Sequence, residues 1–218
     1  MSRYDLVIFD LDGTLLDTGE GILEAVKHTV KVFGFEPMSD EEIKESFIGP
    51  PIQDSFMRRY GIEKERIQDI AKVFRDYYST ESLLLASLYD GMEELFSSLC
   101  ELSVKPAVAT YKREDYALKL LKHFGFGRYT DIMHGADDKN VLKKSDIIEM
   151  CINESGVKDR SRIVMVGDTD GDRVGAERAG VDFIGVTYGF GYKTREDVMR
   201  GYAVGAAETP IEILDIIK

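Results

Sequence analysis

The chain has 218 residues, of which 44% are hydrophobic and 31% charged, and its formal net charge is −12. This composition excludes a disordered chain and predicts a globular protein with a core of its own. The acidic balance leaves no basic stripe for a nucleic acid partner, and no apolar run approaches the roughly 18 residues that a membrane span needs. The start of the chain lacks a signal peptide pattern and Cys100 and Cys151 lie far apart, so we expect a cytoplasmic protein with reduced thiols.

Short apolar runs alternate with segments of helical periodicity along most of the chain. The runs expected to form strands cover residues 6–9, 107–109, 132–133, 163–166, 183–186 and 202–204. The segments expected to form helices cover about 91–102, 113–124, 142–154, 171–179 and 210–217. Alternation at this spacing predicts an α/β fold, a doubly wound parallel sheet with right-handed crossovers.

Residues 17–86 interrupt this alternation, because they contain helix-like segments and no convincing strand. The segments lie at about 20–34, 40–47, 51–60 and 64–79, and the second is expected to begin with Asp40 as its cap. An insertion of about 70 residues is too long for a crossover connection. We therefore expect an all-helical domain at 17–86 inserted into an α/β domain formed by 1–16 and 87–218.

The first strand ends in a cluster of acids, Asp10-Leu11-Asp12-Gly13-Thr14. Ligands of parallel α/β sheets bind outside the carboxyl ends of the strands, so reactive groups belong at this place. Asp10 and Asp12 are two residues apart and project to the same side. Gly13 allows the backbone to turn and to present N–H groups to an anion. Two acids so close imply either Mg²⁺ or a shared proton.

The fourth strand ends in a second acidic sequence, Gly167-Asp168-Thr169-Asp170-Gly171-Asp172. Asp168 directly follows the strand and is the better direct metal ligand, whereas Asp172 lies one helical turn further on. A calcium loop of the helix-loop-helix type needs a Glu as its twelfth residue, and that position holds Ala179. The two strand ends together predict a site for one hard cation.

These two motifs resemble those of the haloacid dehalogenase superfamily, and specifically those of its phosphatases. The resemblance covers nearly the whole chain, because the helical insertion is similar to the superfamily's small cap domain. Residues 47–52, Phe-Ile-Gly-Pro-Pro-Ile, resemble a motif of the branch that contains phosphoglycolate phosphatases and 5'-nucleotidases. The resemblance implies the Rossmannoid fold of that superfamily with a helical cap.

The resemblance also implies a catalytic role for each acid. Asp10 would attack phosphorus and form an aspartyl-phosphate, and Asp12 would exchange the protons as general acid and base. Mg²⁺ would be the cofactor, with Asp10, Asp12 through its backbone carbonyl, Asp168 and Asp172 forming its site.

The phosphate-binding residues implied by the family lie on two other segments and in the loop after Asp12. Thr110 fits the Ser or Thr at the end of the second strand, and Tyr111 stands where the family often has Asn. The phosphate-binding Lys is Lys144 or its neighbour Lys143, and the apolar pair that follows favours Lys144. Gly13 and Thr14 complete the expected substrate-binding set.

The activity implied is Mg²⁺-dependent hydrolysis of a small phosphomonoester, most similar to that of phosphoglycolate phosphatases. The alternatives are a 5'-nucleotidase or pyrophosphatase of the same branch, a sugar-phosphate mutase similar to β-phosphoglucomutase, and a non-enzymatic binding module. A dehalogenase is disfavoured because its pattern lacks an acid at the position of Asp12. The partners expected are a small phosphoester, with no nucleic acid or membrane, and a monomer or homodimer.

Overall fold

The computed structural model describes residues 2–137 and 141–218. Within these residues the chain divides into two units. An α/β unit contains the residues up to Asp17 and those from Leu88 onward, and a helical unit contains Thr18–Ser87. Each junction lies one residue beyond the position expected from the sequence.

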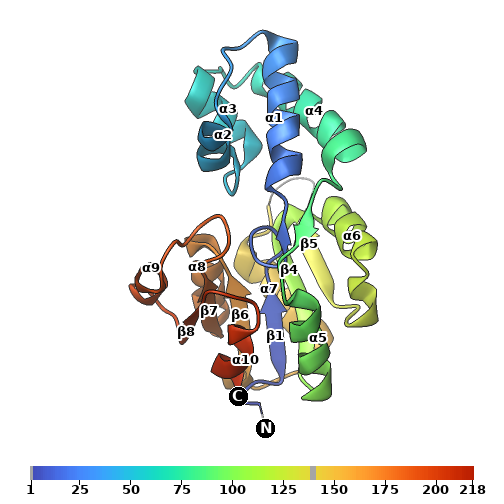
Figure 1. The fold of residues 1–218 in the computed structure, drawn as a ribbon, viewed down its shortest axis with the longest axis vertical. Helices are drawn as coiled ribbons and strands as arrows, with labels where there is room; N and C mark the ends of the chain where they lie inside the picture. The colour runs from blue at the N-terminus through green and yellow to red at the C-terminus, as the bar shows by residue number, and fades with distance from the viewer. Residues whose placement is uncertain (1, 138–140) are drawn as a thin grey trace. The chain divides into compact units, whose positions relative to one another are not determined.

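The α/β unit is built on a six-stranded sheet in which all neighbouring strands are parallel (Figure 1). Its strands are β1 (Leu6–Phe9), β4 (Lys105–Arg113), β5 (Met133–Ala136), β6 (Ile163–Gly167), β7 (Asp182–Val186) and β8 (Gly205–Ala207). Their order in the sheet is β5-β4-β1-β6-β7-β8. The chain therefore proceeds from β1 to one edge, returns to the other side of β1 and proceeds to the other edge. The doubly wound parallel sheet expected from the sequence is confirmed.

Helices cover both faces of this sheet, which explains why β1 and β6 are buried along their whole length. They are α5 (Met92–Glu101), α6 (Glu114–His123), α7 (Lys144–Ser155), α8 (Asp170–Ala179), α9 (Arg195–Met199) and α10 (Glu212–Ile217). In Figure 1, α7 lies behind the sheet and α5 and α10 lie in front of it. Leu6, Ile8 and Met165 share one buried cluster with Ile147 and Ala176 of α7 and α8. Side chains of alternate strand residues thus form the core on this face.

The structure corrects three of the expected strands, and the one expected at 132–133 is found at Met133–Ala136. The strand expected at 202–204 lies instead at β8, because Ala206 and Ala207 pair with β7 although they have low intrinsic strand propensity. The strand expected at 107–109 continues to Arg113, which pairs with Ala136 of β5. The polar residues at the end of β4 are therefore strand residues, and this matters for the site.

Shorter elements were not expected from the sequence. They are the helix α9 and the strands β2 (Leu16–Asp17) and β3 (Ser87–Leu88), which pair with each other. Strands of two residues and a helix of five leave too few positions for a periodic pattern. Within the described ranges, no helix combines the length and the hydrophobicity needed to cross a bilayer.

The helical unit consists of helices in the expected order. They are α1 (Gly19–Phe33), α2 (Asp40–Phe47), α3 (Ile52–Tyr60), α4 (Ile67–Tyr77) and a π-helical turn at Tyr78–Ser82. Each places apolar side chains on one face, and Ile70 and Phe56 are fully buried. The Phe47 and Phe56 rings meet edge to face with centroids 4.9 Å apart, joining α2 to α3.

Ser39, the residue directly before α2, forms a reciprocal cap with Glu42. Ser39 Oγ accepts a hydrogen bond from the Glu42 N–H, and Glu42 Oε2 accepts one from the Ser39 N–H. The expectation that Asp40 caps this helix is wrong, because Asp40 is the first helical residue. Its carboxylate pairs instead with Lys27 at 2.7 Å.

Replacing this cap tests how α2 is stabilised. We expect Ser39→Ala to lower the free energy of unfolding by about 1 kcal/mol, because one helix N–H loses its partner. The exposed Ser97→Ala, inside α5, is the matched control and should change it by less than about 0.5 kcal/mol. Urea unfolding monitored by circular dichroism measures both, and equal losses in the two variants would contradict the capping role.

Candidate active site

The candidate site lies where the winding of the sheet changes direction, at the carboxyl ends of β1, β4 and β6. β1 and β6 are in register, so that Phe9 pairs with Val166 and the two strands end side by side. The Asp10 N–H donates to the Val166 carbonyl, which places Asp10 directly beyond the pair. Ligands bind at such a position because loops on its two sides diverge and leave a crevice.

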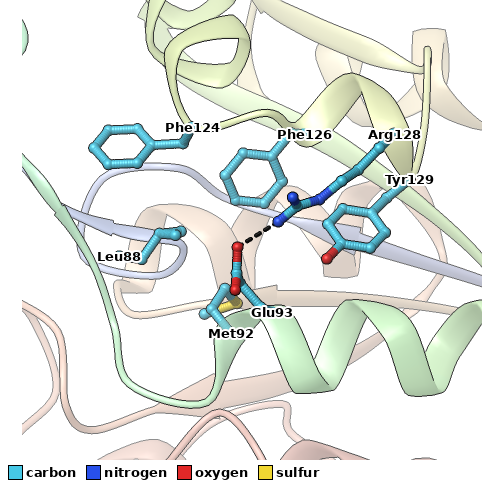
Figure 2. A pocket seen from close by; sticks show the side chains of 7 residues that line it. All are labelled: Leu88, Met92, Glu93, Phe124, Phe126, Arg128 and Tyr129. Carbon is cyan, nitrogen blue, oxygen red and sulfur yellow. Dashed lines mark hydrogen bonds and ion pairs between the residues drawn. The ribbon is translucent and has the colours of Figure 1, made fainter.

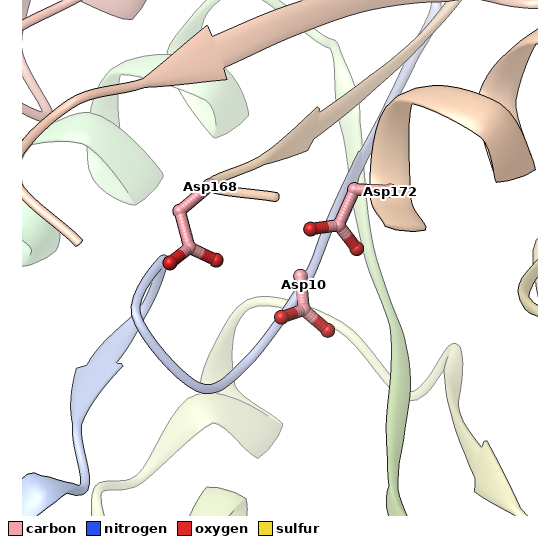
Figure 3. Close-up of side chains that lie close together, drawn as sticks. All are labelled: Asp10, Asp168 and Asp172. Carbon is pink, nitrogen blue, oxygen red and sulfur yellow. The ribbon is translucent and has the colours of Figure 1, made fainter. Parts of the chain in front are cut away.

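Three carboxyl groups from separate segments meet at this position. Asp10, Asp168 and Asp172 are all buried, and one oxygen of each lies within 4.8 Å of the others (Figure 3). The sequence motifs at the ends of the first and fourth expected strands are therefore brought together. Carboxylate oxygens at this spacing are the donor set that a hard divalent cation prefers.

Asp168 is held through only one of its oxygens. Its Oδ2 accepts hydrogen bonds from the backbone N–H groups of Phe190 and Gly191, at 2.8 and 3.0 Å. Its Oδ1 is buried without a hydrogen-bond partner among the described residues. A buried polar atom without a partner is costly. Such an atom, facing two further carboxyl groups, fits a cation site.

Glycines allow the backbone to approach Asp168 closely. Gly13 has φ of 77°, and a Cβ there would lie 2.4 Å from Asp168 Oδ2. A Cβ on Gly189 would lie 2.1 Å from the Gly13 carbonyl oxygen. The lack of a side chain at Gly13 therefore leaves room for the Asp168 carboxyl group. The Gly13 N–H donates to the Leu16 carbonyl and is thus engaged within the loop. Whether Gly13 also binds substrate stays a prediction.

Lys144 is the cation that faces the carboxyl cluster. Its Nζ lies 2.6 Å from Asp10 Oδ1 and 2.6 Å from Asp172 Oδ1, and its side chain is 2% exposed. A Cβ on Gly175 would lie 2.6 Å from Lys144 Cγ, so α8 can accommodate the lysine only with a glycine there. Lys143 directly precedes α7, and within the described ranges no ion pair joins it to these acids; together with Lys144 it lines a pocket of about 320 Å³. The structure thus places Lys144, and not Lys143, among the acids.

Asp172 connects this lysine to the start of α8. Its Oδ2 accepts hydrogen bonds from the Thr169 N–H and from Thr169 Oγ1, forming a reciprocal cap, while Oδ1 pairs with Lys144. Both carboxylate oxygens are therefore engaged by the protein itself. This arrangement suits a residue that positions Lys144 and the Asp168 loop.

Burial and mutual repulsion dominate the electrostatics of the acids. Burial, opposed by Lys144 and reinforced by Asp172, raises the pKa of Asp10 to about 6. Burial together with Asp172 and Asp10 raises the pKa of Asp168 to about 7, although the Gly191 N–H opposes the shift. Burial alone would lower the pKa of Lys144, but the carboxylates of Asp10 and Asp172 outweigh it and raise that pKa. Asp10 and Asp168 therefore hold protons more readily than ordinary carboxyl groups, and they would release these protons when a cation binds.

The end of β4 supplies polar side chains beside these acids. Thr110 is 1% exposed, and its Oγ1 accepts a hydrogen bond from the Lys112 N–H at 3.1 Å, which leaves the hydroxyl proton available to an acceptor. Lys112 Nζ lies 3.0 and 2.9 Å from Oδ1 and Oδ2 of Asp12. Sequence reasoning missed Lys112 because the strand was expected to end at Ala109.

Tyr111 and Thr14, also expected to bind substrate, have other contacts in the structure. The Tyr111 hydroxyl accepts a hydrogen bond from the Lys144 N–H at 2.8 Å, so it satisfies the first turn of α7. The Thr14 side chain is fully buried, and its Oγ1 has no hydrogen-bond partner among the described residues, whereas its backbone carbonyl accepts from the Tyr188 hydroxyl at 3.1 Å. Contact of the Tyr111 backbone N–H and of Thr14 with substrate stays a prediction.

A second pocket, beside α5, is a packing feature. Met92 and Phe126 line it, and an ion pair between Arg128 and Glu93 lies across it (Figure 2). The side chains leave no space for a water molecule between them. This pocket therefore does not suit a polar substrate.

One family model, two relatives and one solved structure are similar to this chain over most of its length. A family model described as "Haloacid dehalogenase-like hydrolase" matches residues 7–186. A 5'-nucleotidase from Pseudomonas aeruginosa is 33% identical over 201 residues, which cover 92% of this chain and 89% of that protein. Pyrophosphatase PpaX from Halalkalibacterium halodurans is 33% identical over 202 residues, covering 92% and 90%. A solved hydrolase of the haloacid dehalogenase-like family from Streptococcus pneumoniae has a TM-score of 0.90 at 26% identity, covering 100% of both chains.

The raised pKa values predict how stability depends on pH and on a divalent cation. A carboxyl whose pKa is raised on folding stabilises the fold when protonated, fully below its unfolded value of about 4. This contribution is lost as the pH rises through the folded values of about 6 for Asp10 and about 7 for Asp168. We therefore expect MgCl₂ to raise the melting temperature by about 5 °C at pH 8 and by much less at pH 5. Differential scanning calorimetry measures both shifts.

Two variants sharpen this measurement. Asp168→Asn should remove most of the effect of MgCl₂ at pH 8, whereas Asp170→Asn, at a 75% exposed side chain, should retain it. If MgCl₂ raised the melting temperature equally at pH 5 and pH 8, or equally in the two variants, a cation site at the buried acids would be contradicted.

Proposed function

The chain belongs to the haloacid dehalogenase-like hydrolases, and from its site we propose that it hydrolyses a small phosphomonoester through a phosphorylated Asp10, with Mg²⁺ as cofactor. The observation that carries this proposal is the convergence of Asp10, Asp168 and Asp172, together with the buried Asp168 Oδ1, which has no hydrogen-bond partner among the residues that the structure describes. Asp10 directly follows β1, and its 8% exposure exceeds the 1% of Asp168 and the 3% of Asp172, so it is the acid best placed to meet a ligand entering at the crevice.

The donor set fits Mg²⁺, because the ion takes hard oxygen ligands. Asp10, Asp168 and the backbone carbonyl of Asp12 would hold it, and Asp172 would act by keeping Lys144 and the Asp168 loop in place. When bound, the ion supplies positive charge that brings the nucleophile and an anionic phosphoryl group together.

In the first step, an oxygen of Asp10 forms a bond to phosphorus while the bond from phosphorus to the ester oxygen breaks. Asp12 gives its proton to that leaving oxygen. Lys144 and the Thr110 hydroxyl donate hydrogen bonds to the phosphoryl oxygens, whose negative charge must be held throughout.

In the second step, Asp12 takes a proton from a water molecule whose oxygen attacks phosphorus. The bond from phosphorus to Asp10 then breaks, which releases inorganic phosphate and restores the carboxylate. The same acid serves both steps because the second reverses the proton demand of the first.

The helical unit at Thr18–Ser87 would act as the cap that selects the substrate. The motif at residues 47–52 resembles that of the branch with phosphoglycolate phosphatases and 5'-nucleotidases, so phosphoglycolate and nucleoside 5'-monophosphates are both candidate substrates. The pyrophosphatase described above adds pyrophosphate. A sugar-phosphate mutase would use the same residues but would return the phosphoryl group to a substrate hydroxyl.

The test is a screen for phosphate release over about a hundred phosphorylated metabolites, with MgCl₂ and with EDTA. Release of free phosphate that EDTA abolishes supports the proposal and separates a hydrolase from a mutase. Calorimetric Mg²⁺ binding without release from any compound would contradict it and leave a mutase or a binding module.

Asp10→Asn should abolish turnover, because an amide neither attacks phosphorus nor binds the cation well. The exposed Asp131→Asn is the matched control and should retain full activity. Phosphate release is the measurement, and mass spectrometry of acid-quenched protein should find a phosphoryl group in the control only. Retained release by the Asp10 variant would refute its role.

Asp12→Asn should lower kcat by roughly 10²- to 10⁴-fold, the range expected when a general acid and base is lost. Its affinity for Mg²⁺ should stay within about twofold, because the backbone carbonyl is unchanged. Steady-state kinetics and titration calorimetry measure the two quantities. A loss below about threefold in kcat would mean that another group moves the proton.

A further inference from the structure

Lys112 is a buried cation that none of the recognised motifs includes. Its side chain is 7% exposed and its Nζ lies 3.0 and 2.9 Å from the two oxygens of Asp12, whose side chain is 25% exposed. Burying an ammonium group is costly unless an opposite charge meets it with good geometry. The Asp12 carboxylate supplies that charge through both oxygens.

The extension of β4 beyond β1 brings these residues together. β1 ends at Phe9, whereas β4 continues to Arg113, so the end of β4 runs beside the loop that carries Asp12. Thr110 and Lys112 are two residues apart on this strand, in the segment where its pairing with β5 shifts register. The hydrogen bond from the Lys112 N–H to Thr110 Oγ1 fixes the backbone between them.

Two contacts from one ammonium group restrict how the Asp12 carboxylate can turn. A carboxyl group on a loop has torsional freedom, and proton transfer demands a heavy-atom distance of about 2.6–3.2 Å to the reacting oxygen. A misplacement of about 1 Å can cost on the order of 100-fold in rate. Proton transfer therefore depends on the orientation of the Asp12 carboxylate.

We propose that Lys112 is a positioning residue that orients Asp12 for proton transfer to the leaving oxygen of the substrate. This inference rests on the function proposed above. Asp12 takes up a proton from solvent on one oxygen when the substrate binds, which leaves its other oxygen to accept the hydrogen bond from Lys112. That proton passes to the leaving oxygen as its bond to phosphorus breaks, and Lys112 keeps its own protons. Lys112 thus acts through Asp12 and not on the phosphoryl group.

The test compares two leaving groups. An alkyl phosphate needs a proton on its leaving oxygen, whereas 4-nitrophenyl phosphate releases a stable anion without one. Because kcat/KM reports the first irreversible step, we expect Lys112→Met to lower kcat/KM roughly 10- to 100-fold for the alkyl phosphate that the wild type hydrolyses best. For 4-nitrophenyl phosphate the loss should stay below about threefold.

Two further variants separate positioning from a structural role. In an Asp12→Asn background, Lys112→Met should lower kcat/KM for the alkyl phosphate by no more than about twofold, because the group it orients is already lost. Lys112→Gln keeps a neutral donor and similar size, and it serves for the same comparison if the Met variant does not fold. Lys122→Met, at an exposed position of α6, is the matched control and should leave both substrates unaffected.

The inference would be overturned if Lys112→Met lowered kcat/KM equally for the two esters. It would also be overturned if Lys112→Met lowered kcat/KM in the Asp12→Asn background as much as in the wild type. Either result would leave the hydrolase function intact. Hydrolysis of neither ester by the wild type, together with no phosphate release in the screen, would overturn the proposed function and this inference with it.

Discussion

The site depends on a charge imbalance that the ion pairs among the described residues do not neutralise. Asp10, Asp168 and Asp172 are buried together, and Lys144 supplies one positive charge among them. Ionised, the three acids leave an excess of two negative charges in a region of low dielectric, where burial already raises the pKa values of Asp10 and Asp168. The fold can keep them there only with bound protons or with a cation. A divalent ion matches the excess charge, and an anionic phosphoryl group then becomes an acceptable neighbour.

The rest of the α/β unit provides the geometry that this cluster requires. β1 lies between β4 and β6, so that acids following two adjacent strands end side by side. Gly175 leaves space for the stem of Lys144, and Gly13 allows the loop to cross directly over Asp168. Each is a place where a methyl group would displace a charged side chain. The backbone is therefore shaped around the acids, and Lys112 extends the same principle to Asp12.

Much of this could be predicted from the sequence, because the strong signals are local. The runs at β1 and β6 are apolar and β-branched, and the acids at their ends follow from the parallel fold. Lys112 was not predicted, since its contact with Asp12 depends on how far β4 continues and no local pattern reports that. The amide donors of Phe190 and Gly191 were missed for a related reason: any residue has a backbone N–H, so its use depends on tertiary structure. β8 has no β-branched residue, and only its pairing with β7 makes it a strand.

The most direct test of the account is the position of the bound cation. Crystals grown with Mn²⁺ in place of Mg²⁺ would locate the ion by its anomalous scattering. The account predicts one ion in contact with both Asp10 and Asp168, meeting the latter through Oδ1, the oxygen that has no hydrogen-bond partner among the described residues. An ion that touches neither carboxylate, or no ion between them at saturating Mn²⁺, would contradict it.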